Sequence, residues 1–118
     1  MKTLVLGASE NVERYSNKAI KMLNRYNHEV CAIGHKKGIV DGVDFDKVKI
    51  LFENVDTVTL YLNPKNQEVF YEYILKIHPR RLIFNPGTEN ETLYKMASEK
   101  GIICQEACTL VLLSTNQY

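Results

Sequence analysis

Short apolar segments alternate along this chain with stretches in which apolar residues recur every three or four positions. The apolar segments predict β-strands, because a strand buried on both faces carries few polar residues. These strands are expected at residues 3–6, 29–33, 56–62, 81–84 and 102–104, with one further short strand within 39–45. The longer spacing predicts intervening helices around Ala19-Leu23-Tyr26, Val69-Tyr73-Ile77 and Leu93-Met96-Ala97. Residues 107–113 predict a final helix or extended segment packed on the sheet.

Capping residues indicate where the predicted helices begin and end. The starts carry residues that bond free backbone N–H groups or fit a first helical turn: Ser16, Asn63 with Pro64, and the capping box Thr88-x-x-Glu91. The ends carry residues that adopt a left-handed conformation or cannot continue a helix: Asn27, Pro79 and Gly101.

The order of these elements, β-α-β-β-α-β-α-β, predicts the topology. Strands joined through helices run parallel and are connected by right-handed crossovers. The chain is therefore expected to form one α/β domain over 1–118, in three layers, with helices on both faces of a doubly wound, mainly parallel sheet of about five or six strands. Ligands of such sheets bind beyond the carboxyl ends of the strands, which directs attention to loops 7–15, 34–38, 63–64 and 85–88.

Composition narrows the possible classes of function. The chain has 118 residues, 25% of them charged, and a formal net charge of +1, so it lacks the basic excess of a nucleic-acid binder. The three cysteines form no CxxC pair, which argues against a zinc site or a disulfide framework. The apolar runs are too short to span a bilayer or to form a signal peptide, so we expect a cytoplasmic protein that does not bind membranes.

The loop after the first strand has the character of a phosphate site. Gly7 permits a sharp turn, Ala8 allows close approach of a ligand, and Ser9 offers a hydroxyl group. Further polar residues surround the start of the next helix, where free N–H groups favour anions: Arg14, Ser16 and Lys18. An ordinary strand-to-helix turn with solvated charges explains the same residues, and the sequence leaves both interpretations open.

The loop after the second strand distinguishes between nucleotide ligands. NAD-binding domains place a carboxylate there to hold the ribose, whereas this loop reads Gly34-His35-Lys36-Lys37-Gly38. Its lysines would suit a phosphorylated ribose, as in NADP or coenzyme A. Two adjacent lysines on a solvated turn are the alternative.

The remaining candidates carry less chemistry. Asn63, Pro64, Asn85 and Gly87 flank the two other strand exits, where capping explains them equally well. No histidine, serine or carboxylate combination forms a catalytic set, and no metal-ligand spacing occurs. His28 and His78 are expected to be surface or capping residues, the pair Arg80-Arg81 to be solvated, and Cys108 to lack an activating base.

Together these segments resemble the single-domain CoA-binding protein family, which is similar to the CoA-binding N-terminal domain of the succinyl-CoA synthetase alpha subunit. The resemblance covers nearly the whole chain and rests on several short motifs in the same order: Gly7-Ala8-Ser9, 13–19, 32–38, Asn63-Pro64, 85–91 and 106–109. It implies a Rossmann-like fold that binds coenzyme A. The second-strand exit departs from the family, where Asn-Pro is frequent and this chain has Gly34-His35.

The resemblance also implies a distribution of roles. Gly7, Ala8 and Ser9 would meet the pyrophosphate, with Arg14, Ser16 and Lys18 nearby. Lys36 or Lys37 would face the 3′-phosphate. The adenine or pantetheine would lie between two sets of residues: Tyr61, Leu62, Asn63 and Pro64 on one side, Asn85 and Gly87 on the other.

Three functions are consistent with these observations. The first is a non-catalytic module that binds CoA or an acyl-CoA. The second is an NADP-binding reductase or sensor subunit, which would need a proton donor such as His35 or Cys108. The third is an interaction subunit with a vestigial pocket. So small a domain could also form a homodimer through a helix or a sheet edge.

Overall fold

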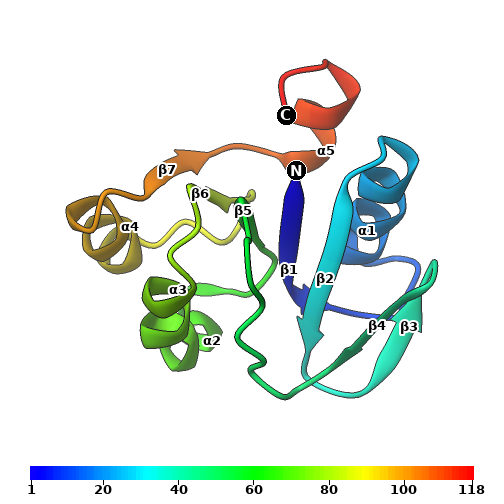
Figure 1. Ribbon diagram of the computed structural model, residues 1–118, viewed down its shortest axis with the longest axis horizontal. Coiled ribbons are helices and arrows are strands. Elements are labelled where there is room, and N and C mark those ends of the chain that lie inside the picture. Colours follow the sequence, from blue (N-terminus) through cyan, green and yellow to red (C-terminus); the bar gives the residue numbers. More distant parts are fainter.

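The computed structural model describes residues 1–118 and contains a seven-stranded sheet in the order β3-β4-β2-β1-β5-β6-β7 (Figure 1). The strands are β1 (Lys2–Ala8), β2 (Glu29–Gly34), β3 (Gly38–Val40), β4 (Val43–Asp46), β5 (Thr57–Leu60), β6 (Arg81–Phe84) and β7 (Ile103–Glu106). All neighbouring strands are parallel except β3 and β4. Helices connect β1 to β2, β5 to β6 and β6 to β7, as the alternating pattern predicts.

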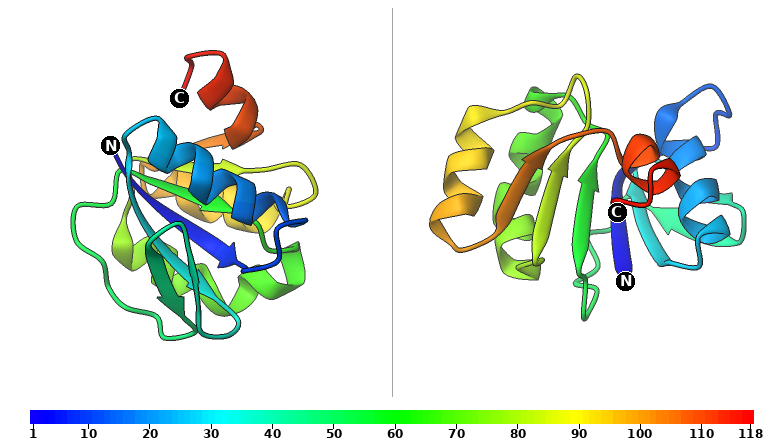
Figure 2. Two further views of the ribbon diagram at one scale, coloured as in Figure 1. Left: turned by 90° about the vertical axis from the view of Figure 1, so that its right-hand side faces the viewer. Right: turned by 90° about the horizontal axis from the view of Figure 1, so that it is seen from above.

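Helices cover both faces of this sheet (Figure 2). They are α1 (Tyr15–Arg25), α2 (Pro64–Gln67), the 3-10 turn η1 (Glu68–Phe70), α3 (Tyr71–Ile77), α4 (Glu91–Glu99) and α5 (Thr109–Ser114). α1 and α5 pack on one face, and α2, α3 and α4 on the other. The three-layer, doubly wound architecture is therefore confirmed, and it is Rossmann-like.

Alternation along β1 divides the core into two layers. Leu4 and Leu6 point to the α3 and α4 side, where they join a cluster that includes Ile74 and Leu93. Val5 points the other way, into a cluster with Ile20 of α1 and Leu113 of α5. Because β1 is buried on both faces, its sequence is almost continuously apolar.

The sheet has one strand more than predicted, because residues 39–45 form a hairpin and not a single strand. Asp41 and Gly42 both have positive φ angles, 50° and 82°, which is the geometry of a tight hairpin turn. β3 therefore folds back antiparallel onto β4, with Ile39 opposite Asp44.

Two predicted helix starts are wrong. Arg14, not Ser16, is the N-cap of α1, and Ser16 lies buried in its first turn. Asn90, not Thr88, caps α4 through its Oδ1, which accepts from the Leu93 N–H at 3.2 Å. The Thr88 hydroxyl instead donates to the carbonyl of Asn85 at 2.8 Å.

The other boundaries agree more closely with the pattern. Asn63 caps α2 by accepting from the Asn66 N–H at 2.8 Å, and Asn27 and Gly101 have the expected positive φ angles. The helix predicted after Asn63 is interrupted by η1 before it continues as α3. His78 then ends α3 in the left-handed region, directly before Pro79, and its Nε2 lies 3.0 Å from the Lys100 carbonyl oxygen.

Arg81 is not a solvated residue, contrary to the expectation for the pair Arg80-Arg81. It is 6% exposed, and its Nε donates to the Thr57 hydroxyl at 3.1 Å. The Tyr118 ring covers the guanidinium at 4.4 Å, and the Tyr118 hydroxyl bonds Thr3 at 2.6 Å. The aromatic cover explains how the side chain is buried without a carboxylate partner.

The helices of this fold are all too short or too polar to span a membrane.

Candidate functional site

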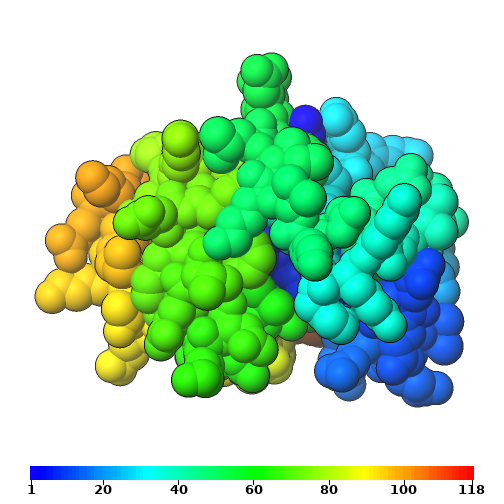
Figure 3. Space-filling model, turned by 90° about the horizontal axis from the view of Figure 1, so that it is seen from below, coloured from blue at the N-terminus to red at the C-terminus, as the bar shows by residue number.

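A cleft of about 750 Å³ opens at the carboxyl ends of the central strands. It lies where the strand order reverses, since β1 has β2 on one side and β5 on the other. Seen from below, a hollow separates the α1 side of the molecule from the α2 side (Figure 3). Its lining comes from the loops after β1, β2, β5 and β6, which are the loops singled out by the topology.

Gly7 brings the first of these loops close to the neighbouring strand exit. Its φ angle is 100°, and a Cβ atom there would lie 2.8 Å from the Tyr61 carbonyl oxygen. For both reasons, any other residue at this position would strain the backbone. The glycine therefore lets the ends of β1 and β5 form one continuous floor.

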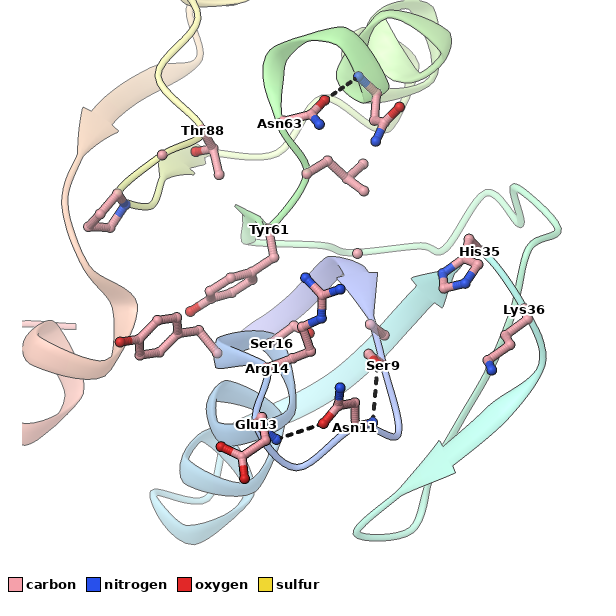
Figure 4. Close-up of a pocket in the computed structure, with 17 residues that line it drawn as sticks. Ser9, Asn11, Glu13, Arg14, Ser16, His35, Lys36, Tyr61, Asn63 and Thr88 are labelled. Carbon is pink, nitrogen blue, oxygen red and sulfur yellow. Dashed lines mark hydrogen bonds between the residues drawn. The ribbon is translucent and has the colours of Figure 1, made fainter.

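The rest of this loop is held by its own hydrogen bonds. Ser9 Oγ accepts from the Asn11 N–H at 3.1 Å, and Asn11 Oδ1 accepts from the Glu13 N–H at 3.0 Å (Figure 4). The buried Asn17 side chain donates to the Ser9 carbonyl at 3.0 Å, which ties the loop to α1. These bonds hold the loop in place. They also occupy polar groups of Ser9 and Asn11 that could otherwise bind a ligand.

The start of α1 nevertheless keeps free donors. The N–H groups of Tyr15 and Ser16, its first two residues, have no acceptor within the protein. Both residues line the cleft, as does the exposed Arg14 at the N-cap. Free amides, the helix dipole and a guanidinium together favour an anion at this point.

The loop between β2 and β3, residues 35–37, supplies positive charge from the opposite side. His35 and Lys36 line the cleft, whereas Lys37 does not (Figure 4). Glu10 Oε2 accepts from the Ile39 N–H at 3.0 Å, so the first loop and β3 are joined directly. The carboxylate of Glu13, also in the lining, is the one acidic side chain among these residues.

The other wall comes from the β5 and β6 exits. Two short loops and the first turn of α2 form it: Tyr61, Leu62 and Asn63 in the first loop, Asn66 in α2, and Pro86, Gly87 and Thr88 in the second loop. Burial raises the pKa of the Tyr61 hydroxyl, which has no hydrogen-bond partner, so the phenol is neutral.

Most of the candidate residues come together at this cleft. Those in its lining are Gly7, Ala8, Ser9, Arg14, Ser16, His35, Lys36, Leu62, Asn63 and Gly87. Those outside its lining are Lys18, Gly34, Lys37, Pro64 and Asn85. Lys18 instead lies over the Tyr15 ring, with Nζ 5.3 Å from the centroid.

Asn85 has a structural position behind the wall. It is 2% exposed, and its Nδ2 donates to Thr59 Oγ1 at 2.6 Å and to the Leu60 carbonyl at 2.8 Å. Its Oδ1 accepts from the Thr109 N–H at 2.8 Å, which fixes the start of α5. Gly34 is equally internal, since a Cβ there would lie 2.5 Å from the Ala8 carbonyl oxygen.

Several lining residues were not singled out from the residue types alone: Asn11, Glu13, Tyr15, Asn66, Pro86 and Thr88. All but Asn66 lie within the loops flagged by the topology or directly at their ends. Asn66 lies outside every ligand motif in the sequence. Its one visible role there is its backbone N–H, which the Asn63 cap accepts. Tyr61 was reached through the family resemblance.

Metal and thiol chemistry find no support in the geometry. No group of three or more His, Cys, Asp or Glu side chains is arranged to hold a metal ion. Burial raises the pKa of the Cys31 thiol to about 11 and also raises that of Cys104. Cys108 lies at the N-cap of α5, outside the lining of the cleft.

The fold and the cleft define a class of protein: a Rossmann-like α/β domain with an anion-favouring pocket over its topological switch point. A family model described as a CoA binding domain matches residues 1–114. The chain therefore belongs to the CoA-binding domain family, as the motifs indicated.

Several solved structures share this fold. One crystal structure of an uncharacterised protein shares 48% identity, with a TM-score of 0.97 over 99% of this chain and 97% of that one. A hypothetical protein from Pyrococcus horikoshii OT3 shares 24% identity, with a TM-score of 0.83 over 96% and 81%. A Thermus thermophilus protein shares 18%, with a TM-score of 0.87 over 99% and 90%. The last two show the fold alone, and no curated protein matches the sequence.

Proposed function

We propose that the chain is a non-catalytic module that binds coenzyme A or an acyl-CoA in this cleft. The observation that carries the proposal is the pair of unpaired N–H groups at Tyr15 and Ser16, in the pocket of a member of the CoA-binding domain family. In this proposal they receive the diphosphate, and the neighbouring Arg14 guanidinium neutralises part of its charge.

The loop between β2 and β3 would recognise the additional phosphate of the ribose. Lys36 is the lysine in the cleft lining, so the proposal assigns the 3′-phosphate to Lys36 and no longer to Lys37. His35 lies beside it as a further polar contact. The adenine or pantetheine would then occupy the other wall, between Leu62 and Asn63 on one loop and Gly87 on the other.

The proposal assigns no catalytic residue. A reductase would need a proton donor in the cleft. Of the two candidates, Cys108 lies outside the lining and His35 lies in it. NADP binding has no support from the family to which the chain belongs. A homodimer through a helix or a sheet edge stays a prediction.

Calorimetry with CoA and dephospho-CoA tests the proposal. We expect the wild type to bind CoA more tightly, because dephospho-CoA lacks the 3′-phosphate. Lys36→Ala should remove that preference, while Lys37→Ala, the matched control on the same loop, should keep it. Equal affinities for both ligands in the wild type would contradict the role of Lys36, and no binding of either would contradict the proposal as a whole.

A further inference from the structure

Gln67 is a polar side chain buried among the large residues of the core. Its exposed fraction is 0%, although it lies at the end of the short helix α2. A buried amide is costly unless its donors and acceptor are bonded, so its partners determine what it does.

Every polar group of this amide has a partner. Nε2 donates to the Leu62 carbonyl and to the Thr88 carbonyl, both at 2.8 Å. Oε1 accepts from Asn90 Nδ2 at 2.9 Å, and Asn90 in turn caps α4. Because both backbone partners are acceptors, the orientation of the Gln67 amide is fixed.

These two carbonyls belong to different loops of the cleft. Leu62 follows β5 and Thr88 follows β6, and both line the pocket (Figure 4). Their strands pair directly, but the strand ladder ends at Leu60 and Phe84. Beyond the ladder, Gln67 is the side chain that bonds the backbone of both loops.

We infer that Gln67 is a positioning residue, which joins the β5 and β6 exit loops into one rigid wall for the bound ligand. It acts through Leu62 and Thr88 and is itself outside the lining. The inference rests on the proposed function for the identity of the ligand, but the joining of the loops is a property of the free protein.

Hydrogen exchange of the free protein tests the joining. We expect Gln67→Leu, which fills a similar volume without polar groups, to accelerate amide exchange in segments 61–63 and 86–88. Ile74→Val is the control, because Ile74 is fully buried in α3 and its substitution removes core packing without removing a hydrogen bond to either loop. Equal exchange in these segments in both variants would overturn the inference.

Calorimetry with CoA tests the consequence for binding. Gln67→Leu is expected to lose affinity on the order of tenfold, the equivalent of one buried hydrogen bond, while Ile74→Val keeps wild-type affinity. Gln67→Glu should bind CoA more weakly at pH 8.5 than near pH 5, because a carboxylate has no hydrogen to donate to the two carbonyls, whereas the neutral acid, which burial favours, has one. Wild-type affinity in Gln67→Leu despite faster loop exchange would overturn the positioning role.

The two proposals fail in different ways. If the wild type binds no CoA, the proposed function and the role of Gln67 toward that ligand fail together. The exchange experiment still decides whether Gln67 joins the loops, since no ligand is present in it.

Discussion

Gly7 lies where β1 enters the cleft, and its torsion and its surroundings both exclude a side chain. We expect Gly7→Ala to lower the free energy of unfolding by roughly 1–3 kcal/mol, because of the strained φ angle and the clash with the Tyr61 carbonyl. It should also weaken CoA binding, since the clash pushes the β1 and β5 exits apart. Denaturant unfolding and calorimetry measure the two effects.

Gly87 allows the effect of the strained φ angle to be measured apart from the effect of the clash. Its φ angle is 91°, but a Cβ there would meet nothing within 4 Å. Gly87→Ala is therefore expected to show the torsional cost alone. A loss of stability as large in Gly87→Ala as in Gly7→Ala would contradict the importance of the Tyr61 contact.

Asp56 couples stability to pH at the other end of the sheet. Bonds from Arg80, at 2.8 and 3.1 Å, hold the pKa of this carboxyl below its usual range. A lowered pKa stabilises the fold above the unfolded value of about 3.9, and the contribution disappears as the pH falls through the lowered pKa. Because Arg80 is largely exposed, we expect only about 0.2–1 kcal/mol from this pair.

Acid unfolding checks this expectation. Asp56→Asn should lose stability near neutral pH and show a shallower decline between pH 5 and pH 2 than the wild type. Asp44→Asn is the control, because Asp44 is exposed and forms no ion pair. A wild-type acid profile in Asp56→Asn would refute the coupling.

Single residues also mark the limit of inference from sequence. Lys36 and Lys37 are adjacent and chemically identical, yet only the first lines the cleft, because successive side chains leave a loop in different directions. Arg81 looked solvated because nothing in its neighbourhood along the chain indicates Tyr118, which covers it from the far end of the sequence. Contacts of this range are visible only after folding.

At the scale of elements, the Glu10 bond joins the first loop to the edge strand β3. We expect Glu10→Ala to accelerate hydrogen exchange of the Ile39 amide, which loses its acceptor, and to loosen β3 together with the preceding loop that carries Lys36. The preference for CoA over dephospho-CoA should therefore shrink. Exchange and calorimetry of the same variant test both parts.

Glu13→Ala is the control for Glu10→Ala, because it removes a carboxylate from the same loop. The Glu13 side chain accepts no hydrogen bond and lines the cleft as a carboxylate. Glu13→Ala should leave Ile39 exchange unchanged and strengthen CoA binding, because it removes a like charge near the diphosphate. Faster Ile39 exchange in this variant would show that the two loops are joined by something other than Glu10.

The elements themselves follow well from the pattern. Strands with continuous apolar sequence and helices with clear spacing were expected at nearly their observed positions, because local periodicity and burial agree there. The hairpin was missed although Asp41-Gly42, between alternating apolar residues, is a turn signal. The capping box at Thr88 failed because its hydroxyl bonds Asn85 instead, a tertiary choice that propensity does not encode.

At the scale of the whole molecule, ligand binding should raise the melting temperature. A ligand at 100 times its Kd stabilises the folded state by about 2.7 kcal/mol, which corresponds to roughly 10 °C for a domain of this size. We expect that shift with CoA and a much smaller one with NADP at the same concentration, measured by scanning calorimetry. A larger shift with NADP than with CoA would favour the NADP-binding alternative, and equal shifts would contradict the preference for CoA.

The location of the cleft was predictable because topology alone determines it: parallel strands bring their carboxyl ends to one edge, and the order reverses beside β1. Its composition was predictable only in part. Asn85 was expected in the wall and instead supports it from behind, while Gln67 drew no attention because a lone glutamine in a helix has no chemical signature. The roles of Asn85 and Gln67 follow from their buried positions, where they bond the backbone of neighbouring segments.

The cleft takes ten of its 17 lining residues from the chain before the exposed stretch that follows β4 and seven from the chain after it. A chain severed there would yield fragments 1–47 and 48–118, neither of which owns a complete pocket. Reassembly would need β1 to find β5 and α1 to find α5. A nucleotide that contacts both fragments would then stabilise their complex. If each fragment carried one half of a split reporter, the reporter signal would rise with the nucleotide concentration.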